Sequence, residues 1–412
     1  MHPRSRIPGA PLPRNVRLLI GTRAARSFGQ GAMVAAFALY LHALGWSGTG
    51  IGTVLMGALL VGSALTLVVG PLSDRGHRRR FLLGYELLQV VVALVAMATT
   101  QPWLLAAAAI LGGFGRGANG SAGPFSPVEQ AWLSHELPMA RRGRVFSFNT
   151  AVGFFGMAGG ALLAALPPWL FGHAMTPADY RLLFALPLLG SLVSLGLLAA
   201  TREIVVAVPA VSPAGHAATR RQENRLLLQL VLVNALNGFG VGLVGPLMAY
   251  WFALKFQQGL AVIGPGMALG FLLGAGGSLL AGRVAARIGV VRSVVVMRAI
   301  GIGLLLLMPL APWFWLAVLL YALRGAFNRG TAGVRQALAT GLTGDARRGL
   351  ASSLQNISMQ VPRAAGPVLA GALFHAGWLS LPFVIGAAFQ CAYVVLYARL
   401  FGAHAAAAPE SA

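Results

Sequence analysis

The chain has 412 residues, of which 57% are hydrophobic and only 10% are charged. A soluble domain carries about a quarter charged residues, so this composition excludes a soluble globule with a polar surface. The formal net charge of +22 is typical of nucleic-acid-binding proteins, but a mean hydropathy of +0.75 excludes that class. We therefore expect an integral membrane protein that is surrounded by the lipid bilayer and binds no nucleic acid.

Apolar runs of membrane-spanning length recur from one end of the chain to the other. A helix needs about 20 apolar residues to cross a bilayer, and the chain has twelve runs of about this length. They lie near residues 18–43, 48–72, 81–100, 103–131, 145–168, 182–201, 226–252, 259–282, 293–310, 314–337, 350–375 and 379–398. The pattern predicts an all-α integral membrane protein with twelve transmembrane helices and both termini on one side.

Basic residues are distributed very unequally between the two sides. The tails and the loops on the side of the termini hold 21 basic residues, whereas the opposite loops hold two, Arg181 and Lys255. Lysine and arginine accumulate in cytoplasmic loops. We therefore expect a multi-pass protein of the cytoplasmic (inner) membrane with both termini in the cytoplasm.

A long polar stretch divides the chain into two parts. Residues 203–225 include Pro209 and Pro213, which favour an irregular linker. We expect an N-terminal six-helix bundle over residues 1–202, a cytoplasmic linker over 203–225 and a C-terminal six-helix bundle over 226–412.

The two halves of the sequence repeat one another. Three short matches occur in the same order, at offsets of 212, 213 and 206 residues. Parallel repeats of this kind are found in secondary transporters, so the two bundles are expected to be pseudo-symmetric. The matching positions are Gly70 with Gly282, Arg116-Gly117 with Arg329-Gly330, and Ala140 to Gly143 with Ala346 to Gly349.

A charged segment between the second and third runs carries the strongest motif. Residues 70–80 read Gly-Pro-Leu-Ser-Asp-Arg-Gly-His-Arg-Arg-Arg, and they resemble the signature loop of the major facilitator superfamily, roughly G-x-L-[AS]-D-R-x-G-R-[RK]. One position differs, because His77 stands where the pattern has its second glycine. Arg116 and Asn119 lie in a stretch similar to the family pattern R-x-x-Q-G-x-G-x-A, with asparagine in place of glutamine.

This resemblance implies the major facilitator fold and a secondary active transporter that moves small organic solutes by alternating access. It also implies an efflux carrier that works as a monomer, and it makes proton coupling an expectation. Two alternatives stay open: an uptake carrier or exchanger for organic anions, and a non-transporting membrane receptor or scaffold. The sequence has no catalytic triad, phosphate-binding loop or cluster of metal ligands, so we expect neither an enzyme nor a cofactor or metal.

The signature loop is the predicted conformational switch, formed by Gly70, Asp74, Arg75, Arg78 and Arg79. By resemblance, the Asp74 carboxylate faces the start of the helix predicted near 350–375. A carboxylate at a helix N-terminus is favourable by about 0.3–1 kcal/mol, so breaking this contact would accompany inward opening. The alternative is that Asp74 only pairs with Arg75 or Arg78 at the surface.

Arginines inside the apolar runs are the main candidates for the transport cavity. An arginine at mid-bilayer costs at least about 2.5 kcal/mol, so it must face a partner or a wet cavity. Arg116 lies near the middle of the run 103–131 and is expected to serve coupling or substrate binding, unless it only anchors neighbouring carbonyl groups. The other candidates are Asn119, Arg26, Gln30, Arg324, Arg329 and Arg363. Several such arginines would favour anionic substrates, although those near a helix end can snorkel to the interface.

Carboxylates are scarce, since only Glu86 and Glu129 lie within or at the edge of the apolar runs. Glu86 is expected to form a structural ion pair near the signature loop. Glu129 is expected to pair with Arg141 or Arg142, and it is the best candidate for proton coupling, which needs a titratable group in the membrane. The runs expected to line the cavity have no carboxylate at mid-depth.

A further set of polar and aromatic residues is expected to shape the substrate cavity. Each could instead cross-link helices, at about 0.6 kcal/mol per bond. The set comprises Phe37, Tyr40, Asn149, Asn234, Asn237, Asn356 and Gln360. The stretch from Gly153 to Gly160 lies where family antiporters carry a glycine–proline export pattern, but it lacks the proline.

The switch assignment gives a first prediction. Asp74→Asn keeps the protein folded but slows transport by up to about fivefold, because the asparagine loses the roughly 1 kcal/mol interaction of a carboxylate with a helix N-terminus. Turnover is measured in proteoliposomes with the amount of monodisperse protein as the control. Unchanged turnover in this variant would rule out the switch role.

Overall fold

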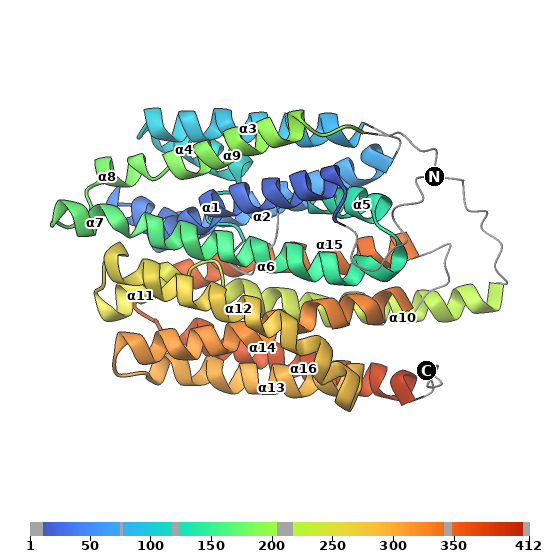
Figure 1. Ribbon diagram of the computed structural model, residues 1–412. Helices are drawn as coiled ribbons and strands as arrows, with labels where there is room; N and C mark the ends of the chain where they lie inside the picture. The colour runs from blue at the N-terminus through green and yellow to red at the C-terminus, as the bar shows by residue number, and fades with distance from the viewer. Residues whose placement is uncertain (1–10, 75–76, 118–122, 204–216, 342–347, 407–412) are drawn as a thin grey trace. The chain divides into compact units, whose positions relative to one another are not determined.

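The computed structural model describes residues 11–74, 77–117, 123–203, 217–341 and 348–406. Every regular element within these residues is helical (Figure 1), so the predicted all-α class is confirmed. The elements of the first half are α1 (Arg14–Ala43), α2 (Gly48–Asp74), α3 (Arg78–Ala98), α4 (Pro102–Gly112), α5 (Ser126–Glu136), α6 (Met139–Ala164), α7 (Leu166–Phe171), α8 (Pro177–Leu182) and α9 (Ala185–Ala199). Those of the second half are α10 (Ala217–Val244), α11 (Met248–Phe256), α12 (Leu260–Ile288), α13 (Val290–Leu307), η2 (Met308–Leu310), α14 (Phe314–Gly341), α15 (Arg348–His375) and α16 (Leu381–Ala406).

Eight stretches of the described chain are long and apolar enough to cross a membrane. They comprise α2, α3, α6 with α7, α8 with α9, α10 with α11, α12, α13 with η2, and α16. The apolar parts of α4 and α14 are shorter, and α1 and α15 contain buried arginines, which lower their hydropathy. Together these segments are consistent with the twelve predicted transmembrane helices.

The run predicted near 103–131 is not one helix, and that expectation was wrong. Helix α4 ends at Gly112 and α5 begins at Ser126. Glycine adopts positive φ without steric cost, so a glycine-rich segment breaks a helix even when its composition is apolar. The glycines with positive φ in this segment are Gly113 (68°), Gly115 (74°), Gly117 (101°) and Gly123 (87°).

The chain folds as two compact units, each with its own internal contacts. Unit 1 comprises residues 1–45, 61–208 and 258–271, and unit 2 comprises residues 46–60, 209–257 and 272–412. Each half of the sequence thus supplies most of one unit and a helical segment of the other. The bundle limits predicted above stay a prediction; α10 begins at Ala217, within the predicted linker.

The two units repeat the same order of helix packing. In unit 1, α1 packs against α6 and α9, while α3 packs against α4 and α9. In unit 2, α10 packs against α15 and α16, while α13 packs against α14 and α16. Each pair in the first half has its counterpart in the second. The predicted pseudo-symmetry of two helical bundles is therefore confirmed.

Glycines bring the backbones of α1 and α6 into direct contact. A Cβ on Gly160 would collide with the Phe28 carbonyl group, and one on Gly156 would lie 2.9 Å from the Ala24 carbonyl oxygen. On the other side, a Cβ on Gly31 would collide with the backbone of Met157. Small residues four positions apart allow such close approach of membrane helices. The stretch compared above with an export pattern therefore provides the contact surface between α6 and α1.

This packing predicts that Gly160→Val destabilises the protein by at least about 2 kcal/mol, because overpacking is costly where backbone cannot move away. Gly196→Val is the matched control: Gly196 lies on α9 with no atom within 4 Å of the place of a Cβ, so it should change stability by less than about 0.5 kcal/mol. Unfolding in mixed micelles measures both. Equal effects of the two valines would contradict the contact.

Candidate functional site

Helix α1 carries a polar stripe on its buried face. Arg23, Arg26 and Gln30 follow one another at spacings of three and four residues, which places them on one side of a helix. Arg23 and Arg26 are only 3% and 8% exposed. Two guanidinium groups therefore lie inside unit 1, where they require partners of opposite charge or polar groups.

The Arg26 guanidinium joins two carboxylates from two other helices. Its Nη1 donates a hydrogen bond to Glu86 Oε1 of α3 at 3.1 Å, and its Nη2 donates to Glu129 Oε1 of α5. Ser194 of α9 donates its hydroxyl to the same Glu86 oxygen at 3.0 Å. This group of four residues, the Arg26 cluster, thus links α1, α3, α5 and α9.

The charges in and around the Arg26 cluster balance. Glu86 is 0% exposed and Glu129 is 3% exposed, so neither carboxylate is stabilised by bulk water. Arg23, one turn before Arg26, interacts electrostatically with both Arg26 and Glu129. Counted at their formal charges, the two arginines and the two glutamates sum to zero. Adding one proton to either carboxylate therefore leaves one net positive charge in a buried place, which is costly unless the surroundings rearrange.

One of the two expectations about the carboxylates needs correction. Glu129 pairs with Arg26 rather than with Arg141 or Arg142, and Arg142 instead donates from Nε to the Leu137 carbonyl oxygen at 3.1 Å. Glu86 does form the expected structural ion pair, with Arg26, and it lies six residues beyond Arg80, roughly 9 Å along α3 from the end of the signature segment. The pairings were missed because they join segments 60 and 103 residues apart.

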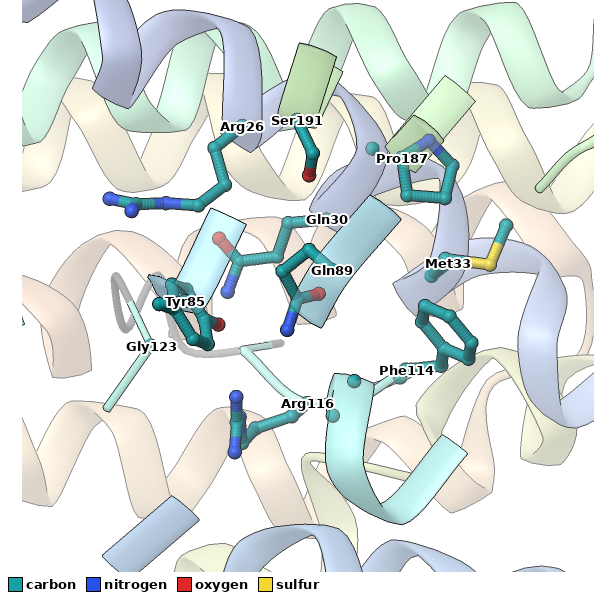
Figure 2. Close-up of a pocket in the computed structure, with 14 residues that line it drawn as sticks. Arg26, Gln30, Met33, Tyr85, Gln89, Phe114, Arg116, Gly123, Pro187 and Ser191 are labelled. Atoms are coloured by element: carbon teal, nitrogen blue, oxygen red, sulfur yellow. The ribbon is translucent and has the colours of Figure 1, made fainter. Parts of the chain in front are cut away.

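A narrow polar cavity adjoins the Arg26 cluster (Figure 2). Its volume is about 40 Å³, which is room for a few water molecules and far below the roughly 300 Å³ of the smallest usual ligand pockets. Figure 2 shows the side chains of Gln30 and Gln89 reaching into the space between Arg26 and Arg116. The lining also includes Tyr85, Ser191 and several glycines. The cavity is suited to hold water beside a buried ion pair.

Arg116 lies in the glycine-rich turn after α4 and not inside a helix, which corrects its predicted placement. Its side chain is half-buried and lines the polar cavity. A Cβ on Gly62 of α2 would collide with its guanidinium group, so the arginine occupies the space that a glycine leaves on α2. The turn thus positions the Arg116 guanidinium group at the cavity, although no continuous helix runs through this segment.

Phe37 and Tyr40 lie further along α1 in a cluster of aromatic rings. Both are 1% exposed. The Phe37 ring lies 5.9 Å from that of Phe114, and the Tyr40 ring lies 5.7 Å from that of Phe184. These contacts pack α1 against α9 and the end of α4, and the predicted role of both residues in a substrate cavity stays a prediction.

Unit 2 contains a second buried polar cluster that was not predicted from the sequence. Arg298 of α13 is 3% exposed and donates to Asn237 Oδ1 at 3.1 Å and to Thr331 Oγ1 at 3.3 Å. Its guanidinium carbon lies 5.6 Å from the centre of the Tyr393 ring. Arg298 is the one charged residue in the run 293–310. A single charge within an apolar run is the sequence signal that could have identified it as part of a buried polar cluster.

Arg298 occupies the position in the second repeat that Glu86 occupies in the first. The two positions differ by 212 residues, the offset that relates Gly70 to Gly282. In unit 1 the third-helix residue is an acid that receives hydrogen bonds from α1, whereas in unit 2 it is a base that donates to α10. The two repeats therefore share a hydrogen bond between these two helices, but the residue on the third helix is negatively charged in one repeat and positively charged in the other.

The remaining predicted residues are placed as follows. Arg324, Arg363 and Asn234 are buried in unit 2, and Arg363 Nη1 donates to Gln360 Oε1 at 3.3 Å. Asn149 is half-buried on α6. Outside the described part of the structure lie the burial of Gly70 and the side chains of Asp74, Arg75, Asn119, Arg329 and Asn356.

The first turn of α3 is held by a carboxylate from beyond α9. The backbone N–H groups of Arg78 and Arg79 donate to the two oxygens of Glu203 at 2.7 and 3.0 Å. Two free N–H groups at a helix start are thereby satisfied, and the negative charge is favourable there. Arg79 also donates from its guanidinium group to the carbonyl oxygens of Leu198 and Ala199.

His77, where the family pattern has glycine, adopts the conformation that glycine favours. Its φ is 67° and its ψ is 26°, in the left-handed region that residues with a side chain rarely enter. His77 thus adopts a left-handed conformation at the position where the family pattern has its second glycine.

Two bundles of apolar helices that repeat the same order of packing are an architecture found in secondary transporters of membranes. The family model of the Major Facilitator Superfamily matches residues 19–226 and 230–412. The chain therefore belongs to the Major Facilitator Superfamily, and it is a transporter rather than an enzyme. No curated protein sequence matches the chain.

Solved structures with the same fold come from several kinds of transporter. A mutant of the nucleoside transporter NupG aligns with a TM-score of 0.73 at 12% identity, over 94% of this chain and 100% of that one. A bacterial homolog of the human lysosomal transporter Spinster gives 0.71 at 15% identity, over 95% and 98%. The D-xylose–proton symporter gives 0.68 at 16% identity, over 93% and 96%. At these identities the likeness concerns the fold alone.

The Arg26 cluster predicts that Arg26→Met destabilises the protein by about 3–5 kcal/mol, because two buried carboxylates lose their cation. Adding Glu86→Gln and Glu129→Gln to that variant should restore most of the loss, since no unpaired charge remains. Arg144→Met, at an exposed position, is the control. If the triple variant is as unstable as Arg26→Met, charge balance is not what the cluster provides.

Proposed function

We propose that the chain is a proton-coupled carrier that exports small organic solutes by alternating access. The observation that carries this proposal is the Arg26 cluster, in which Glu86 and Glu129 share one guanidinium group beside a water-sized polar cavity. Coupling to protons requires a carboxylate that gains and loses a proton within the membrane. Both carboxylates are buried, and their shared partner Arg26 lines the cavity, which supports them as the groups that carry the proton.

Protonation acts on the helices through the hydrogen bonds of Arg26. A neutral carboxylic acid holds a guanidinium group less strongly than a carboxylate does, so a proton on Glu129 loosens α5 from α1. Helix α5 follows the glycine-rich turn, which permits a change of direction at several positive-φ positions. A proton on Glu86 would act in the same way between α3 and α1. The ion pair thus links the protonation state to the relative position of helices.

The environment and direction of transport belong to the same proposal. The bias of 21 basic residues against two supports an inner-membrane protein with both termini in the cytoplasm. Export follows from the family resemblance, and each copy works as a monomer in the lipid bilayer. The similar folds of a nucleoside transporter and a D-xylose–proton symporter support a small organic substrate and a proton as its partner.

The test is transport by proteoliposomes with an imposed pH gradient, using a panel of cationic drugs, neutral solutes and organic anions. We expect the gradient to accelerate wild-type transport and to leave Glu86→Gln or Glu129→Gln, or both, without acceleration, because a glutamine cannot carry the proton. The direction of transport is determined by comparing vesicles in which the protein has opposite orientations in the membrane.

Glu136→Gln is the matched control, since Glu136 lies on α5 with Glu129 but bonds to Asn15 and Trp132 instead of Arg26. It should keep the response to the gradient. Substrate exchange without a gradient shows that the variants still transport. A full response in both cluster variants would overturn the assignment of the proton site.

A carrier for organic anions is the second candidate, and one observation favours it. Arg298, Arg324 and Arg363 are buried in unit 2, whereas residues 226–344 contain no acidic residue. The membrane part of the second half therefore has a positive potential, which attracts anions. Movement of anions alone in the same panel, without any effect of the pH gradient, would favour this candidate.

A further inference from the structure

An apolar groove of about 480 Å³ runs along the surface of unit 1 between α2 and α3. Leu65 and Leu72 line it from α2, and Phe81 and Leu88 line it from α3. Gly84 lies between the last two and has no atom within 4 Å of the place of a Cβ. The groove is therefore open beside the second turn of α3, and its size is that of a ligand site rather than a packing defect.

The exposed side chains of α2 and α3 near the groove are mostly large and apolar, as expected of a surface that contacts lipid. Large apolar side chains on both helices are 40–60% exposed, which in a membrane-spanning chain means contact with acyl chains. On α2 and α3 they are Leu67 (44%), Val68 (57%), Leu72 (41%), Leu87 (58%), Val91 (50%) and Leu94 (50%). The occupant of a groove open to this face comes from the bilayer.

One end of the groove is basic. His77 and Arg80 line it, and both are exposed. Consecutive helical residues point about 100° apart, and the preceding arginine, Arg79, is engaged by the carbonyl groups at the end of α9. Arg80 is thus the residue of the arginine triplet that is directed along the groove. A guanidinium group at the end of an apolar channel matches the phosphate of a lipid headgroup.

The wall of the groove is shared with the candidate site. Tyr85 and Phe125 line it and stack on each other with ring centres 4.5 Å apart at 23°. Tyr85 also lines the polar cavity beside the Arg26 cluster, and Phe125 directly precedes α5, which carries Glu129. The stacked pair therefore separates the membrane from the polar cavity.

We propose that this groove is a binding site for one anionic glycerophospholipid of the surrounding bilayer. Its phosphate contacts Arg80 and His77, and one acyl chain follows α3 past Gly84 to Leu88, a span of roughly 16 Å from residue 77. The bound chain covers the Tyr85–Phe125 pair and keeps the polar cavity closed toward the membrane. The site depends only on the membrane location of the chain and not on the proposed substrate or coupling ion.

Native mass spectrometry of the purified, delipidated protein tests the site with phosphatidylglycerol as the probe and phosphatidylethanolamine as the comparison lipid. Wild-type protein should bind a first phosphatidylglycerol molecule more tightly than any further phosphatidylglycerol molecule. It should also bind this first molecule more tightly than it binds phosphatidylethanolamine. Arg80→Gln should weaken that binding about fivefold, the factor for one basic residue near an anionic headgroup. Gly84→Leu fills the groove without changing the charge of the protein, and it should weaken lipid binding by excluding the acyl chain.

The second repeat supplies matched controls. Arg292 is an exposed arginine at the third position of α13, as Arg80 is of α3, and Gly303 is an exposed glycine of α13 with no atom near the place of its Cβ. Arg292→Gln and Gly303→Leu should bind phosphatidylglycerol as wild type does. Equal binding of both lipids by wild type, or equal losses in the α3 and α13 variants, would overturn the site and leave only unspecific lipid contact.

Discussion

The burial of Arg26 between two carboxylates is the constraint on which the first unit depends. A guanidinium group inside a membrane protein is tolerated only when its charge and its donors are satisfied, and here the partners come from α3 and α5. The helices α1, α3 and α5 must therefore keep a fixed rotation and a fixed depth in the membrane, because all three contribute to the ion pairs of Arg26. Glycines 31, 156 and 160 permit this by bringing α1 and α6 close enough to leave the other side of α1 for the ion pair. Packing and electrostatics thus specify the same position of α1.

The internal repeat shows how one architecture carries two different polar centres. Both units join the helix at the first position of the repeat to the helix at the third through a buried arginine, Arg26 in one and Arg298 in the other. The first centre pairs its arginine with two carboxylates, and the second holds its arginine with an amide, a hydroxyl group and an aromatic face. A duplicated bundle can thus hold two centres of different charge. The first centre adjoins the polar cavity lined by Arg26 and Arg116.

The parts of the fold that depend on local composition were predictable, and those that depend on contacts between distant segments were not. Runs of apolar residues gave the helices, and the offset of 212 residues gave the repeat. The break before α5 was missed because hydropathy does not distinguish glycine-rich turns from apolar helix. The partner of Glu129 was missed because proximity in sequence favoured other arginines over Arg26, which lies 103 residues away and meets it only after α1 and α5 pack.

The bond between Glu203 and the first turn of α3 has a consequence for how the polypeptide can be divided. Glu203 lies after the last helix of the first half, yet it completes a helix start that precedes it by 124 and 125 residues. A first half ending at residue 202 would leave two helix N–H groups unsatisfied at the signature loop. Two half-proteins produced as separate chains should therefore be separated after Glu203, so that the first keeps its own closing residue and the second is free to start with α10.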